Sequence, residues 1–138
     1  MLVKEGIGIV DADDLIEPSS RVVAAKVNVP GARQIVVVSA YFRCSIGMTQ
    51  DNVDLLAHIG VGFDKWRGDG VLGADFNATP QEVANKSGGA LSRMQIIAPT
   101  APRGTCAGTV RSKGRVLDYF MMLAGLAGSL KCIDVDYN

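Results

Sequence analysis

GVLGADFNATP, residues 70–80, is the stretch that decides the fold of this 138-residue chain. It opens with small and apolar residues, as a strand covered on both faces requires, and reaches Asp75 where that strand should end. Pro80 and Glu82, after a threonine, form the pattern of a helix start with a capping box. Because open α/β sheets bind ligands at the carboxyl ends of their strands, Asp75 and Asn77 are candidate site residues. The alternative is a polar turn that closes the strand, with Asn77 making an Asx turn.

Strand and helix patterns continue on both sides of this stretch. A turn signal at residues 29–32 separates strand-like runs at 21–29 and 34–42, which we expect to pair as an antiparallel hairpin. Residues 49–67 carry apolar side chains at three- and four-residue steps, which predicts an amphipathic helix over one sheet face. Further strands are predicted near residues 5–10, 105–110, 116–123 and 130–135. The order of these elements indicates an α/β sandwich.

Length and composition indicate a single domain over residues 1–138. The chain is 48% hydrophobic and 20% charged, which is ordinary for a globular protein. It contains no apolar run of the roughly 20 residues that a membrane helix needs, and its first residues do not resemble a signal peptide. Three widely spaced cysteines argue against a disulfide framework. We therefore expect an intracellular protein, cytoplasmic or nuclear, with no membrane segment and no obvious protein partner.

The charges are balanced in number but uneven along the chain. The net charge is zero, yet no acid lies between Glu82 and Asp118. The basic residues of that interval are Lys86, Arg93, Arg103, Arg111, Lys113 and Arg115. Such a stretch could attract an anionic substrate, for example a nucleic acid backbone or a phosphate ester. The alternative is a solvated loop whose charges serve solubility.

Three motifs follow one another along the chain, namely IVVVSAYF at 35–42, GADFN at 73–77 and RVLDYFMML at 115–123. GADFN and RVLDYFMML are similar to the paired G-[GA]-D-[FL]-N and [IL]-D-Y-[IF] motifs of the DNase I-like endonuclease/exonuclease/phosphatase superfamily. IVVVSAYF at 35–42 is similar to its strand that ends in an active-site tyrosine. The resemblance implies part of a four-layer α/β sandwich, in which two packed, mainly antiparallel or mixed sheets are flanked by helices.

The resemblance also implies a metal-dependent phosphoester hydrolase that uses Mg²⁺ or Mn²⁺. The basic interval favours a nuclease that hydrolyses phosphodiester bonds of nucleic acid. Phosphoinositide phosphatases and sphingomyelinase-like enzymes use the same core and remain alternatives within the enzyme class. A non-catalytic remnant or binding module that keeps the core of the fold is the alternative from another class.

Individual roles follow from the motif positions. Asp75 matches the family's water-activating aspartate, and Asn77 matches its transition-state amide; both are candidate metal ligands. Tyr41 matches the tyrosine that holds the phosphate, with a core aromatic as the alternative. Asp118 matches the aspartate that orients a catalytic histidine, and we expect it to be buried between its apolar neighbours. The candidate substrate contacts are Arg43, Arg111, Lys113 and Arg115.

The chain also departs from the family pattern. The resemblance implies early strands with a metal-binding asparagine and glutamate, which would precede Met1, and an Asp-His pair that would follow Asn138. The single histidine, His58, lies in the predicted helix and matches no catalytic position. We therefore expect residues 1–138 to be the central and later portion of the domain, truncated at both ends and inactive alone. Retroelement endonucleases resemble this arrangement too.

Overall fold

Six strands form one mixed sheet in the computed structural model, which describes residues 7–30, 33–99, 104–106, 114–130 and 133. The strands are β1 (Ile9–Asp11), β2 (Val22–Val27), β3 (Ile35–Tyr41), β4 (Asp69–Asp75), β5 (Met94–Ile97) and β6 (Asp118–Leu123). Their spatial order is β1-β2-β3-β4-β6-β5. Only β3 and β4 are parallel; the other neighbouring strands pair antiparallel. A mixed sheet with helices is the α/β class that the sequence predicts.

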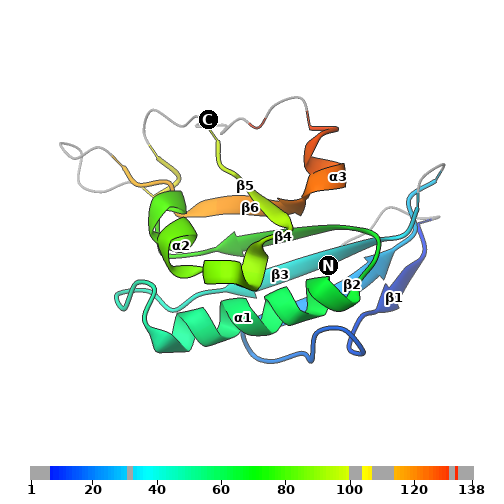
Figure 1. Cartoon of the computed structure of the whole chain (residues 1–138), viewed down its shortest axis with the longest axis horizontal. Coiled ribbons are helices and arrows are strands. Elements are labelled where there is room, and N and C mark those ends of the chain that lie inside the picture. The colour runs from blue at the N-terminus through cyan, green and yellow to red at the C-terminus, as the bar shows by residue number, and fades with distance from the viewer. Residues whose placement is uncertain (1–6, 31–32, 100–103, 107–113, 131–132, 134–138) are drawn as a thin grey trace.

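The helices connect the strands, and α1 covers one face of the sheet. They are α1 (Gln50–Lys65), α2 (Pro80–Lys86), the 3₁₀ helix η1 (Gly88–Leu91) and α3 (Ala124–Ala127). Figure 1 shows α1 and η1 on the near side of the sheet. The parallel pairing of β3 and β4 requires a crossover connection, and α1 provides it.

The core lies between α1 and the covered face of the sheet. Alternate residues of β3 and β4 point into it, and the apolar stripe of α1 packs against them. Its fully or almost fully buried members include Val36, Val38, Leu72, Leu56, Ile59 and Phe63. Gly62 brings α1 close to the segment after β1, since a Cβ at this position would lie 2.2 Å from Cγ1 of Ile16.

Several local predictions are confirmed. The hairpin of β2 and β3 pairs Val22 with Ala40 and Val27 with Ile35. The capping box of α2 is complete, because Oγ1 of Thr79 accepts the Glu82 N–H at 3.4 Å and Oε2 of Glu82 accepts the Thr79 N–H at 2.6 Å. That bond from the Thr79 backbone is the main reason why the pKa of Glu82 is lowered.

Other sequence predictions need correction. No strand was predicted at residues 94–97, where β5 forms a four-residue strand at the edge of the sheet. Of the strand expected at 105–110, Thr105 and Cys106 are described, and Cys106 forms only an isolated bridge with Arg115. Of the strand expected at 130–135, Leu130 and Ile133 are described, and both lie outside strands. The described residues contribute one of the two sheets that the resemblance implies.

The second face of the sheet, which we call the open face, is apolar and partly exposed. It carries the odd-numbered residues of β3 and β4 and the residues paired with them. The exposed fraction is 52% for Val23 and 40% for Phe120.

The two faces should differ in their response to substitution. Leu72→Ala should lower the free energy of unfolding by about 2–5 kcal/mol, because it opens a cavity in the core. Val23→Thr, nearly the same shape on the open face, should change that free energy by less than about 0.5 kcal/mol. Urea unfolding followed by circular dichroism measures both. Equal destabilisation by the two substitutions would show that Val23 is buried in solution.

Candidate active site

Tyr41, Asp75 and Asp118 lie side by side at one end of the sheet. Tyr41 is the register partner of Asp75 in the parallel pair β3/β4, and Asp75 is the register partner of Asp118 in the antiparallel pair β4/β6. Directly opposite residues project from the same face of a sheet. One hydroxyl and two carboxylates therefore form a row across three strands, on the open face. We call these three residues the polar row.

A stack of aromatic rings lies behind the polar row. Phe42, Phe76 and Tyr119 each follow a member of the row in sequence, and all three are buried. The ring centroids of Phe42 and Phe76 are 5.0 Å apart, and those of Phe76 and Tyr119 are 4.2 Å apart. The hydroxyl of Tyr119 donates to the Ala78 carbonyl at 3.1 Å, and burial raises the pKa of this tyrosine strongly. Tyr119 is therefore a neutral structural residue.

The backbone continues the pairing beyond the row. The N–H of Phe42 donates to the Asp75 carbonyl at 3.0 Å, and the N–H of Phe76 donates to the Leu117 carbonyl at 2.9 Å. These bonds tie the end of β3 to β4 and the end of β4 to the start of β6. The three strand ends are thus joined by backbone hydrogen bonds as well as by stacked rings.

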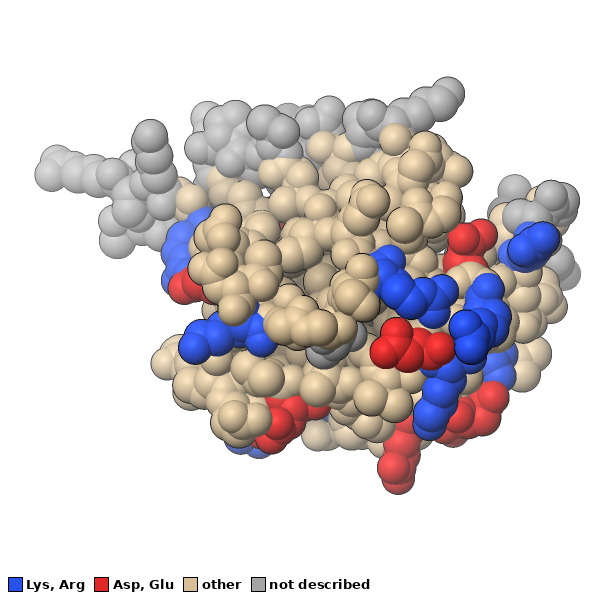
Figure 2. All heavy atoms as spheres, in the orientation of Figure 1, with Lys and Arg blue, Asp and Glu red and all other residues tan. Residues whose placement is uncertain are grey.

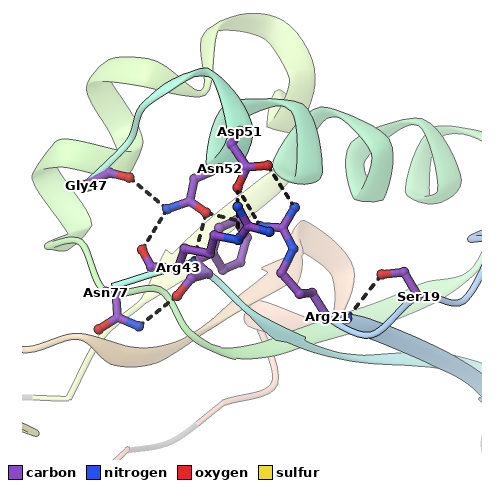
Figure 3. A network of polar contacts seen from close by, with 8 residues as sticks. Ser19, Arg21, Arg43, Gly47, Asp51, Asn52 and Asn77 are labelled. Carbon is purple, nitrogen blue, oxygen red and sulfur yellow. Dashed lines mark hydrogen bonds and ion pairs between the residues drawn. The ribbon is translucent and has the colours of Figure 1, made fainter. Parts of the chain in front are cut away.

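Asn77 occupies a tight turn directly after β4. Its φ is +48°, in the left-handed region that asparagine tolerates better than most residues. Its backbone N–H donates to Oδ1 of Asp75 at 3.1 Å. Its side-chain Nδ2 donates to the Phe42 carbonyl at 2.7 Å (Figure 3). The Asx turn expected as an alternative at Asn77 is therefore made by Asp75, whose carboxylate accepts the backbone N–H two residues later. An amide nitrogen carries two hydrogens, so Asn77 retains one for a ligand.

A groove of about 660 Å³ runs along the open face beside Asp75 and Asp118. Thr105 lines it, and its Oγ1 accepts the N–H groups of Leu117 at 2.8 Å and Asp118 at 2.9 Å. Since both bonds use the oxygen as acceptor, the hydroxyl hydrogen of Thr105 can donate into the groove. The sequence signal for Thr105, a Gly-Thr-Cys segment similar to one in the family, was too short to assign it a role.

Two expectations about the row are settled by burial. Asp118 was expected to be buried and is exposed, because strand alternation turns Leu117 and Tyr119 into the core and Asp118 to the open face. Asp118 is therefore exposed and needs no buried partner. Tyr41 has an exposed fraction of 45%, so the core-aromatic alternative is wrong for this residue. Phe42, the next residue, occupies the core instead.

Cys44 raises the pKa of Tyr41. The interaction between the Tyr41 hydroxyl and the Cys44 side chain is the largest of the effects that raise this pKa, and the negative charge of Asp75 adds to it. Tyr41 is consequently a protonated hydrogen-bond donor at neutral pH.

The predicted basic contacts are only partly placed. Arg43 directs its Nε toward Oδ2 of Asp51 at 3.7 Å (Figure 3), and Arg115 pairs with Oε2 of Glu82 at 2.7 Å. Both side chains are more than half exposed. Arg111 and Lys113 lie outside the described residues. Figure 2 shows basic and acidic side chains interspersed on the face it presents.

The row supplies the kind of oxygen donors that Mg²⁺ or Mn²⁺ would need. Within the described ranges, no group of three His, Cys, Asp or Glu side chains could hold a metal ion. Asp75 and Asp118 nevertheless face each other across neighbouring strands. Mg²⁺ is commonly held by one or two carboxylates together with substrate phosphates. Asp75 and Asp118 fit that role, and Asn77 stays a predicted ligand beside Asp75.

Comparison with known proteins identifies the fold. No protein-family model and no curated protein sequence matches the chain. The catalytic domain of human Nocturnin, solved with a bound sulfate anion, has a TM-score of 0.54 at 13% identity, over 75% of this chain and 41% of that one. TDP2 from D. rerio, complexed with a single strand DNA product, has a TM-score of 0.56 at 13% identity, over 95% and 56%.

A third solved structure agrees. An endonuclease/exonuclease/phosphatase from Beutenbergia cavernae has a TM-score of 0.50 at 18% identity, over 88% of this chain and 38% of that one. The chain therefore has the fold of these solved structures, which is the DNase I-like fold that its motifs predict. It spans between 38% and 56% of the length of these three solved chains. Among the described residues, no helix has both the length and the apolar character to cross a bilayer.

Replacement of Cys44 should change the titration of Tyr41. Because the contact with Cys44 raises the pKa of Tyr41, Cys44→Ala should lower that pKa toward the ordinary value of about 10. The Tyr41 ring carbon shifts, followed by NMR from neutral to high pH, measure it. Cys106→Ala is the matched control, since Cys106 is also an exposed free cysteine. An unchanged Tyr41 titration in the Cys44 variant would contradict the assignment.

Proposed function

We propose that the polar row and Asn77 form the reaction centre of a metal-dependent phosphodiester hydrolase that acts on nucleic acid. The observation that carries the proposal is the register of Tyr41, Asp75 and Asp118 across three adjacent strands. The DNase I-like fold supports a phosphoester substrate. The single strand DNA product in the D. rerio TDP2 structure supports nucleic acid over phosphoinositide or sphingomyelin.

Asp75 would act as the base. The Asn77 N–H holds Oδ1 of Asp75 at 3.1 Å, which fixes the carboxylate and leaves Oδ2 to accept a proton from the attacking water. The water oxygen then bonds to phosphorus as the ester P–O bond breaks, and the leaving oxygen takes up a proton from solvent.

Neighbouring donors would stabilise the charge that grows on the phosphoryl oxygens. Tyr41 presents a protonated hydroxyl, and Asn77 presents the amide hydrogen that Phe42 does not use. Donors of this kind lower the barrier because they are fixed in place before the reaction. A bound Mg²⁺ or Mn²⁺ would supply further neutralisation of the phosphate charge.

A non-catalytic nucleic-acid-binding module is the second candidate. The observation that favours it is the position of the chain's single histidine. His58 lies on α1, where its Nε2 is 3.4 Å from the Glu17 carbonyl, so it does not face Asp118. General acid or base groups contribute typically 10²–10⁴-fold to a rate. A chain without a histidine beside Asp118 can therefore retain the binding surface and lose most of the chemistry.

Hydrolysis assays separate the two candidates. We expect the chain to cleave plasmid DNA and an abasic-site duplex slowly and only with Mg²⁺, because its single histidine does not lie beside Asp118. Asp75→Asn should reduce that cleavage by about 10²–10⁴-fold. Asp69→Asn, at the other end of β4 and on the same face, is the control and should change it little.

The outcomes that contradict the proposal are specific. Mg²⁺-dependent cleavage that is insensitive to Asp75→Asn would show that GADFN is not the reaction centre. Mg²⁺-dependent DNA binding without cleavage would favour the binding module. A phosphoinositide assayed in parallel, with and without a chelator, tests the alternative substrate.

A further inference from the structure

Asn52 is the fully buried polar residue of the described core, and it lies in the first turn of α1. Residues at such positions are usually apolar or, when polar, have partners that require them. Every buried side-chain N and O atom of the described residues has a hydrogen-bond partner, so Asn52 is fully satisfied. Its partners show what it does.

The amide of Asn52 binds the backbone of the loop between β3 and α1. Oδ1 accepts the Arg43 N–H at 3.0 Å, and Nδ2 donates to the carbonyls of Arg43 at 3.0 Å and Gly47 at 2.7 Å (Figure 3). Both hydrogens and the oxygen of the amide are used. Only a side chain that donates twice and accepts at the same time can make this set of bonds. Aspartate retains only the acceptor, and leucine retains none.

The loop held by Asn52 reaches directly into the proposed reaction centre. Phe42 precedes Arg43, and its carbonyl accepts Nδ2 of Asn77 at 2.7 Å. The N–H of Phe42 donates to the Asp75 carbonyl at 3.0 Å. Asn52 therefore fixes the peptide after Phe42, and Phe42 fixes the side chain of Asn77. The contacts form one continuous path from α1 to the end of β4.

Ion pairs around the same loop are weaker supports. Asp51 binds Arg21 with distances of 2.9 and 3.2 Å and lies 3.7 Å from Arg43 (Figure 3). These side chains are partly exposed, and exposed pairs contribute little to stability. Loss of the buried amide would instead leave two carbonyls and one N–H without partners, which costs more. Asn52 is thus the dominant contact of the loop.

We infer that Asn52 is a positioning residue, which orients the Asn77 amide by holding the peptide that follows Phe42. The inference rests on the proposed function, because it gives Asn52 a role through Asn77. Asn52 lies in α1, more than twenty positions before GADFN, and would thereby contribute to the geometry of the site.

Hydrogen exchange measured by NMR tests the inference without relying on catalysis. The rates of the Asn77 side-chain amide and the Phe42 backbone amide are each divided by the rate of the Leu72 amide, which reports opening of the buried core. Asn52→Ala should raise these ratios at least about tenfold, because the path to Asn77 is broken. Leu56→Ala, a buried apolar substitution on the same helix, is the matched control and should leave the ratios near the wild-type values.

Each outcome decides the inference. Equal ratios in the Asn52 and Leu56 variants would overturn it, since Asn52 would then contribute only to overall stability. If Asn52→Ala does not fold, Asn52→Leu takes its place, because leucine has a similar volume and retains neither the donors nor the acceptor of the amide. A raised ratio in that variant supports the inference, and an unchanged one overturns it. A hydrolysis rate that Asp75→Asn does not change would overturn the proposed function, whereas the exchange result for Asn52 would still hold.

Discussion

The stack of Phe42, Phe76 and Tyr119 is the constraint on which the site depends. Each ring neighbours one member of the polar row in sequence, and strand geometry turns adjacent residues in opposite directions. Burial of the rings in the core therefore orients Tyr41, Asp75 and Asp118 toward the open face. Truncation of a buried phenylalanine costs about 3–5 kcal/mol, whereas an exposed ion pair such as Arg115–Glu82 contributes roughly 1 kcal/mol or less. The rings, rather than the surface charges, hold the site together.

Asn77 connects this stack to a second support. Its backbone N–H fixes Asp75, and its side chain binds the Phe42 carbonyl, 35 residues earlier in the chain. Asn52 approaches the same peptide from α1. The turn after β4 is thus stabilised by the packed rings of Phe42, Phe76 and Tyr119 and by the buried Asn52 amide, which binds the peptide after Phe42. A site held on rigid elements in this way keeps its donors in place before a substrate arrives.

Local sequence signals predicted much of this arrangement. The strand before Asp75, the capping box of α2 and the amphipathic helix α1 all follow from patterns within one element. Likewise, the three motifs identified every member of the polar row. β5 escaped prediction because it has four residues and depends on pairing with β6, more than 20 positions later.

The errors about individual residues have the same cause. Asp118 has apolar neighbours in sequence, but the sheet places them on the other face. The partners of Asn77 and Asn52 lie on other elements, so neither side chain's role could be read from its surroundings in sequence. A polar residue in the first turn of a helix resembles a solvent-facing one until the loop that it binds is known.

We propose that Asp75 and Asp118 act as one site. A Mg²⁺ titration followed by the carboxyl carbon shifts of both residues tests it most directly. Because few ligands surround the ion, we expect weak, millimolar binding, with both signals following one curve. Asp75→Asn should then abolish the response of Asp118. Separate curves for the two carboxylates, or an unchanged Asp118 response in the Asp75 variant, would contradict the account.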